Sequence, residues 1–505
     1  MVAPGTTRTH GNERERTGRL EITMANRKTL AVHAAAIVAA ALAFSPLGAS
    51  SVSGPAGPVY AIKGARIHTV SGAPIAGGTI VMRNGVIEDV GANVNVPADA
   101  IVIDGANMNV YPGLIDMDNA APIGDDTTAD AAGGRGGRGG ATTFTTLEEA
   151  ERAKHAVIMR PNFMAAANLR ATSAELQQLA SAGVTTVLAA PSTGIFKGQS
   201  ALVNVAIPAD DPQISTLADY RTGLAVVKSP VAQHVNMSGR GGGAGYPGSL
   251  LGTIAFTEQG FLDAQWQRDA EAQYQRAGAK GARPLIEPAL DALKPALAKQ
   301  IPVAFDVNEA REIDRALKLA AEFGLDPIVV GAASAAERKA ELAAAKARVI
   351  LSLNFPGGQG GGAAAPGGGA GGRGGGGGAL SLRQLKAQAD APKVPAQLAQ
   401  ANVVFAFSSG GATPANFVRN AGRVIKEGGL GADAVLKALT LGAAQIAGAA
   451  DRVGSLEKGK IANLIVVEGD VFDGGRVRHV FIDGRQVEVV EPPAAQTGRG
   501  GRGGR

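Results

Sequence analysis

The sequence predicts an α/β protein in which a central series of βα units is flanked at both ends by antiparallel β segments. Between about residues 183 and 446, short runs of β-branched and apolar residues alternate with stretches of helical spacing. Residues 59–110 and 454–487 instead alternate apolar and polar residues between turn signals, as half-buried strands do. With 505 residues, 45% of them apolar, the chain can bury a large core.

The first β segment contains four alternating runs, and Asn84-Gly85 between two of them is a strong hairpin signal. In the centre, the apolar runs predict buried strands and the amphipathic stretches predict helices. The strands are expected at 183–190, 301–307, 327–330, 348–353 and 402–408, and the helices at 171–181, 309–323 and 432–446.

The stretch 110–121 organises this pattern. Pro112-Gly113 interrupts the preceding strand, and Leu114 to Asp118 is expected to form a buried strand that opens a new domain. Pro-Gly-Leu-Ile-Asp-Met resembles the first barrel strand of the metal-dependent amidohydrolases, in their imidazolonepropionase-like branch. The resemblance implies a (β/α)8 TIM barrel over about 113–450. It also implies a composite β-sandwich made from residues 51–112 and 451–495.

In that family, His-x-His after the first strand binds a catalytic metal, and metal-bound hydroxide hydrolyses C–N bonds in cyclic amides or peptide-like substrates. This chain has Asp118 and Ala120 at those two positions. The strand that resembles a second His-x-His stretch ends in Asp306 and Asn308. Gly331 stands in place of a further histidine and Gly410 in place of the barrel aspartate. Because a catalytic Zn²⁺ needs about three protein ligands, we expect a metal-free pseudoenzyme without a cofactor, which binds a ligand or a partner.

The chain has six histidines, and only His234 is placed where it could reach a pocket; a structural role for it is the alternative. The others are His10, His33, His68, His155 and His479.

Carboxylates and amides offer an alternative metal site. Asp118, Asn119, Asp306 and Asn308 are expected at the ends of barrel strands, where TIM-barrel active sites form. Oxygen ligands suit Mg²⁺ or Ca²⁺ better than Zn²⁺. Asp118, Asp306 and Asn308 would then be the ligands of an active, divalent-metal-dependent amidohydrolase. Asp116 lies before the mouth and is expected to brace the strand.

Four further residues are pocket candidates. Lys197 and Gln199 lie in a loop that resembles a family segment ending in Gly-Gln-Ser. Ser408 and Ser409 follow the last predicted strand, but no histidine base can be assigned to either serine, which argues against a serine hydrolase. The sequence therefore assigns no catalytic residue.

The first 50 residues predict an export signal and hence a periplasmic or secreted protein. A basic start at 24–28 precedes an Ala-rich apolar run at 30–44 and small residues suited to cleavage at 46–51. Met24 is the expected translation start. The apolar run is shorter than the roughly 20 residues of a membrane span, so no stable span is expected, with an uncleaved anchor as the alternative.

The absence of cysteine and the small net charge bear on which sites and partners the chain can have. Without cysteine the chain has no disulfide or thiolate metal site, and outside the leader and the Gly/Arg tail at 496–505 its charge is close to neutral. We therefore expect no nucleic acid partner. Glycine-rich tracts at 133–140, 239–248, 356–378 and 498–505 are expected to be loops. The expected partners are a small-molecule or peptide-like ligand and a histidine-intact amidohydrolase homologue.

Overall fold

The computed structural model describes residues 58–120, 122–123, 146–169, 173–205, 226–238, 247–355 and 381–490. The predictions for the leader, the Gly/Arg tail and almost all of the glycine tracts fall outside these residues. Among the described helices, none is both long enough and apolar enough to cross a membrane.

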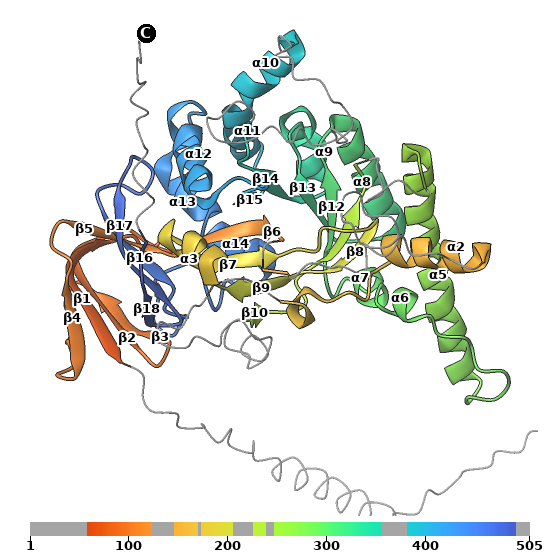
Figure 1. The fold of residues 1–505 in the computed structure, drawn as a ribbon, viewed down its shortest axis with the longest axis horizontal. Coiled ribbons are helices and arrows are strands. Elements are labelled where there is room, and N and C mark those ends of the chain that lie inside the picture. The colour runs from red at the N-terminus through yellow and green to blue at the C-terminus, as the bar shows by residue number, and fades with distance from the viewer. Residues whose placement is uncertain are drawn as a thin grey trace, which may run out of the picture. The chain divides into compact units, whose positions relative to one another are not determined.

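Strands from both ends of the chain form one eight-stranded sheet (Figure 1). The two ends join where β16 pairs antiparallel with β5, and β5 also pairs with β1. The described strands of the two terminal segments thus form one continuous sheet, in which β1 pairs with β2, β4 and β5, rather than the two separate sheets of a sandwich. The strands are β1 (Val59–Ile67), β2 (Ile75–Arg83), β3 (Val86–Gly91), β4 (Ala100–Asp104), β5 (Met108–Pro112), β16 (Leu464–Glu468), β17 (Arg476–Ile482) and β18 (Arg485–Val487).

Two glycine-containing turns close hairpins in this sheet. Asn84-Gly85 joins β2 to β3, and both residues have positive φ, as the predicted two-residue hairpin requires. Asp483-Gly484 joins β17 to β18 with the same signs. The two turns touch, since a Cβ on Gly484 would lie 2.8 Å from the Cα of Gly85. Glycine is required there by both backbone conformation and space.

The centre of the chain forms two further sheets. One has the order β10-β9-β7-β6 and the other the order β15-β14-β13-β12-β11-β8. Strands β6 and β7 pair in parallel, as do β11 to β15 in succession. The bounds are β6 (Leu114–Asn119), β7 (Val184–Ala189), β8 (Phe196–Gln199), β9 (Ala201–Asn204), β10 (Val226–Lys228), β11 (Gln233–Asn236), β12 (Val303–Val307), β13 (Pro327–Gly331), β14 (Arg348–Ser352) and β15 (Phe405–Ser408).

The first and last of these parallel strands, β6 and β15, lie side by side without a described ladder between them. Two hydrogen bonds instead link β6 to residues that follow β15 in the chain. The backbone N–H of Ile115 donates to the carbonyl of Leu439 at 2.7 Å, and the N–H of Ser409 donates to the side chain of Asp116. The described strands are thus those of a mixed α/β fold, and their backbone hydrogen bonds do not close into a barrel.

Helices alternate with the parallel strands and cover their outer side (Figure 1). The helix predicted over 432–446 is instead two helices, because the carbonyl of Leu439 bonds to β6 and the chain turns at Thr440. The helices are α2 (Leu147–Ile158), α3 (Ser173–Ser181), α5 (Leu250–Arg276), α6 (Pro288–Asp291), α7 (Lys294–Leu297), α8 (Ala310–Phe323), α9 (Lys339–Ala344), α10 (Leu382–Asp390), α11 (Val394–Gln400), α12 (Pro414–Lys426), α13 (Ala432–Ala438) and α14 (Leu441–Ala447).

The core has two layers around the parallel strands. Ile115, Met117, Ala304 and Ile328 belong to an inner cluster, while alternate residues such as Leu114 and Phe305 pack in a larger cluster with the helices. This alternation follows from the period of two along a strand. Both faces of these strands are apolar because both are covered.

A buried polar network joins the composite sheet to the central strands. Asn463 donates to Thr186 at 3.1 Å and to Asn204 at 2.8 Å, and Asn204 donates to Asp483 at 2.7 Å. The backbone N–H of Asp483 in turn donates to Asn463. Burial raises the pKa of Asp483 to about 6, although the bond from Asn204 lowers it.

We predict that Asp483→Asn stabilises the protein above pH 6. Because the pKa of Asp483 is higher in the folded state than in the unfolded chain, stability decreases as pH rises through about 6. Asparagine keeps the hydrogen-bond acceptor and tolerates positive φ. Urea denaturation at pH 8 should show a gain on the order of 1 kcal/mol after solvent screening, and a smaller gain at pH 4.5. The exposed Asp451→Asn is the control, and an equal gain at both pH values would contradict the prediction.

Candidate functional site

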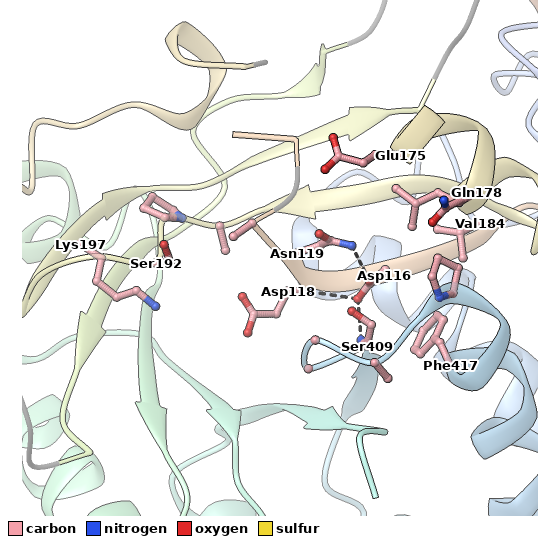
Figure 2. Close-up of a pocket in the computed structure, with 18 residues that line it drawn as sticks. Asp116, Asp118, Asn119, Glu175, Gln178, Val184, Ser192, Lys197, Ser409 and Phe417 are labelled. Atoms are coloured by element: carbon pink, nitrogen blue, oxygen red, sulfur yellow. Dashed lines mark hydrogen bonds between the residues drawn. The ribbon is translucent and has the colours of Figure 1, made fainter. Parts of the chain in front are cut away.

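A pocket of about 440 Å³ opens at the carboxyl ends of β6 and β7, beside the loop that follows β15 (Figure 2). Polar groups on its wall come from these strand ends and from α3, whereas the start of α12 contributes apolar surface. The pocket lining includes Asp116, Asp118, Asn119, Glu175, Gln178, Leu179, Val184, Lys197, Ser409, Gly410 and Phe417.

Asp116 is fully buried and connects β6 to the loop after β15 at the pocket wall. Its carboxylate accepts hydrogen bonds from the backbone N–H of Ser409 at 2.7 Å and from the side-chain amide of Asn119 at 2.9 Å. Burial raises its pKa, while these hydrogen bonds act in the opposite direction. The bracing role expected for Asp116 agrees with this geometry, which connects β6 to the loop after β15.

The carboxylate of Asp118 points into the open space of the pocket (Figure 2). Burial raises its pKa to about 7; the positive charge of Lys197 lowers the pKa, and the charges of Asp306 and Asp116 raise it. Near neutral pH this group can therefore take up or release a proton at the pocket wall.

Lys197 lies on β8 and forms an ion pair with Asp306 on β12. Its side chain is 9% exposed and that of Asp306 is 21% exposed. Burial lowers the pKa of Lys197, but the nearby carboxylates of Asp306 and Asp118 outweigh that effect and raise it above its ordinary value. The structure thus places an ammonium group among two carboxylates from different strands.

His234 lies on β11 in the interior, near this charged group. Both ring nitrogens are buried and have no hydrogen-bond partner among the described residues, and the same holds for Oδ1 of Asp306. Burial lowers the pKa of His234 to about 4, which keeps the ring neutral at physiological pH. His234 does not line the pocket; it lies buried beside the charges of Asp306 and Lys197, which both influence its pKa.

The other predicted pocket residues divide into two groups. Asn119 and Ser409 line the pocket. Gln199 is buried and approaches the carbonyl of Ala292, Asn308 lies beside Gly331, and Ser408 is buried at the end of β15, so none of these three lines it.

Sequence reasoning did not identify Glu175, Gln178 and Phe417. They come from the faces of α3 and α12 that turn toward the strand ends. Helical spacing identifies a buried face but does not show which exposed residues will border a pocket.

Gly331 and Gly410 correspond to family metal-ligand positions, and neighbouring side chains fill the space that a Cβ atom would need there. A Cβ on Gly410 would lie 1.9 Å from Oγ of Ser352, and a Cβ on Gly331 would lie 2.8 Å from Oδ1 of Asn308. Both glycines also have positive φ. The described residues contain no group of three His, Cys, Asp or Glu side chains that could hold a metal ion. The donor set in this part of the chain therefore does not fit a divalent metal centre.

Comparison with known proteins agrees with this architecture. Residues 384–487, which run from α10 through β15 to the end of the composite sheet, match the model of the amidohydrolase family. This match is limited to about a fifth of the chain. A crystal structure of an amidohydrolase from Thermotoga maritima matches with a TM-score of 0.65 and 21% identity, over 85% of this chain and 99% of that one.

A putative prolidase from Bifidobacterium longum matches with a TM-score of 0.48 and 17% identity, over 86% of this chain and 95% of that one. A zinc-bound adenosine deaminase from Xanthomonas campestris gives 0.44 and 16%, over 85% and 92%. No curated protein matches the sequence. The fold assignment rests on the Thermotoga maritima structure, whose identity of 21% shows a shared fold and no more.

We predict that Lys197→Met destabilises the fold at neutral pH, because it leaves the carboxylates of Asp306 and Asp118 without a counter-charge. Breaking a buried pair in this way should cost about 3 kcal/mol in urea denaturation at pH 7. The cost should shrink as pH falls below about 7, where Asp118 becomes protonated, and adding Asp306→Asn should restore much of the loss. Lys437→Met, at an exposed position on α13, is the matched control. An equal effect of the two lysine substitutions would contradict a role for Lys197 in charge balance.

Proposed function

We propose that this chain is an exported, metal-free pseudoenzyme with a (β/α)8 barrel, whose mouth binds a small ligand. The observation that carries the proposal is the position of Lys197, whose ammonium group pairs with Asp306 and lies near Asp118. Both carboxylates lie near the carboxyl ends of strands, β6 and β12, that resemble metal-binding strands of the family. A lysine side chain supplies there the positive charge that a metal would otherwise supply.

The barrel assignment rests on the order of the strands. Helices stand between β6 and β7 and between successive strands from β11 to β15, whereas the short strands β8 to β10 connect β7 to β11, and β6 lies beside β15. The segment at Leu439 contacts β6 through a backbone hydrogen bond and thus occupies the remaining gap. This arrangement is consistent with a ring of strands whose last connection is irregular.

The residues at the mouth support binding rather than hydrolysis. Hydrolysis of an amide requires an activated water or nucleophile and a group that stabilises the developing oxyanion. Asp118 can exchange a proton near neutral pH, but Lys197 is held in an ion pair and no histidine lines the pocket. Gly410, in place of the barrel aspartate, offers no side chain that could act beside Asp118.

The composition of the pocket indicates the class of ligand. Its lining includes the carboxyl groups of Asp116, Asp118 and Glu175 but only one cation, Lys197, which is paired with Asp306. The apolar side chains Leu179, Val184 and Phe417 complete the wall. We therefore favour a small organic cation, or a peptide-like molecule with a protonated amine, that also presents an apolar group.

We also propose that the protein is exported and that it pairs with a second protein. The signal-like segment before residue 51 supports a periplasmic or secreted location. A histidine-intact amidohydrolase homologue could supply the catalysis that this chain lacks, and co-purification of such a homologue is the expected sign of this pairing.

One observation favours the active alternative. Oδ1 of Asp306 and the nitrogens of His234 are buried without partners among the described residues, and an ion close to Asp118 would satisfy them. Such an ion would have to compete with the ammonium group of Lys197. The two readings therefore differ in a measurable property, the metal content of the protein.

We predict that the mature protein retains far less than one metal ion per chain after dialysis against Zn²⁺, Mn²⁺ or Mg²⁺, and that a chelator leaves its melting temperature unchanged. Elemental analysis and thermal denaturation provide the measurements. Retention of about one ion per chain would support the alternative if it were lost in Asp118→Asn but kept in Asp433→Asn, a matched change at an exposed helix position. Detection of C–N hydrolysis in the same preparation would also overturn the pseudoenzyme assignment.

Ligand class can be tested with three molecules of similar size: benzylammonium, benzyl alcohol and benzoate. We predict that only benzylammonium binds in isothermal titration calorimetry. Its affinity should rise as pH increases through about 7, because Asp118 then becomes ionised. Asp118→Asn should weaken binding about tenfold, equivalent to about 1.4 kcal/mol. Preferential binding of benzoate would contradict the assigned ligand charge.

A further inference from the structure

Helix α5 (Leu250–Arg276) is apolar on two opposite faces. One face is buried against the strands and neighbouring helices through Thr257, Phe261 and Ala264. The opposite face presents Leu251, Ala255, Leu262 and Trp266 to solvent. These positions are separated by four, seven and four residues, which places them in one stripe along the helix.

The exposure of this stripe is high for such large side chains. Leu251 is 76% exposed, Leu262 is 49% exposed, and Trp266, the single tryptophan of the chain, is 68% exposed. Single exposed apolar residues are normal, but a continuous apolar surface generally marks an interaction site. Large aromatic residues in particular tend to contribute most to the energy of protein interfaces.

The helix presents this stripe on a rigid support. Gln267, on the buried face, accepts a hydrogen bond from the backbone N–H of Glu287 at 2.8 Å and donates to its carbonyl at 3.4 Å. Lys294 pairs with Glu271 at 2.5 Å. These contacts hold the segment that follows the helix, residues 277–287, against its distal half. This segment exposes Leu285 and Ile286. In Figure 1 this half extends away from the strands, beyond α6 and α7.

We propose that the exposed face of α5 is the dimer interface of this protein, with α5 of a second copy packed against it in antiparallel orientation. Charge complementarity identifies the second copy as the occupant. Residues 250–263 contain two acidic residues and no basic residue, whereas 264–286 contain four basic and two acidic residues. Within the helix the charges of 264–276 balance, and the basic excess comes from Lys280 and Arg283 in the segment that follows it. An antiparallel two-fold arrangement places the acidic first half of each helix beside the distal half and this basic segment of the other.

The dimensions of the helix fit this arrangement. A helix of 27 residues is about 40 Å long at about 1.5 Å per residue. The stripe from Leu251 to Trp266 covers more than half of that length, and Leu285 and Ile286 add apolar surface at the distal end. The face therefore runs along most of the helix, as an interface between two packed helices requires.

The test is sedimentation equilibrium of the full chain over a range of concentrations, with tryptophan emission recorded on the same samples. We expect a monomer–dimer equilibrium, and a blue shift of Trp266 emission as the dimer forms. Leu262→Asp should weaken dimerisation at least about tenfold and abolish the concentration-dependent shift. Leu382→Asp, at an exposed leucine on α10, should leave both properties unchanged.

Charge reversal provides a second, independent measurement. Changing Glu258 and Asp263 together to lysine should weaken the dimer, because the first half of α5 then becomes basic like the segment of the other copy that carries Lys280 and Arg283. Combining these changes with Arg276→Glu and Lys280→Glu should restore it. A monomer at every concentration would overturn the proposal. A dimer that persists in Leu262→Asp, with Trp266 still emitting as an exposed indole, would also overturn it, because the dimer would then use another surface.

Discussion

The arrangement of the site depends on one buried carboxylate, that of Asp116. Strands β6 and β15 lie side by side without a described ladder, so backbone pairing alone does not hold the mouth closed at this point. Asp116 connects them by accepting a hydrogen bond from the backbone of Ser409, and it also orients Asn119. A buried carboxylate is costly unless such donors surround it. This interaction positions both Asp118 and the loop at Gly410 on the pocket wall.

Charge balance is the second constraint on the site. Asp118 and Asp306 approach one another from different strands, and their repulsion would favour a bound cation or a shifted protonation state. The chain provides both responses, because Lys197 pairs with Asp306 while the pKa of Asp118 is raised to about 7. The neighbouring His234 remains neutral and buried. The side chains of Lys197 and Asp118 thus offset much of the negative charge that the strand ends bring together.

The sequence predicted the architecture better than the site. The strands of the centre follow from β-branched apolar runs, and the Asn84-Gly85 hairpin follows from the positive φ of its turn. Long-range pairing was harder to predict: the break at Leu439 depends on a hydrogen bond to Ile115, more than 300 residues away. For the same reason Lys197 was expected only as a pocket residue, and its ion pair with Asp306, 109 positions later, could not be predicted from either local segment.

The two glycines at former ligand positions connect these observations. Gly331 and Gly410 both have positive φ, and the space that a side chain would need is taken up by Asn308 and Ser352. Restoring a histidine or aspartate there would therefore require the backbone and a neighbouring strand end to move. The ammonium of Lys197 would in addition have to leave its carboxylates. A metal centre that used these two positions would thus demand several coupled changes, whereas binding a small cation at Asp118 requires none, and this difference is the physical argument behind the proposed ligand-binding role.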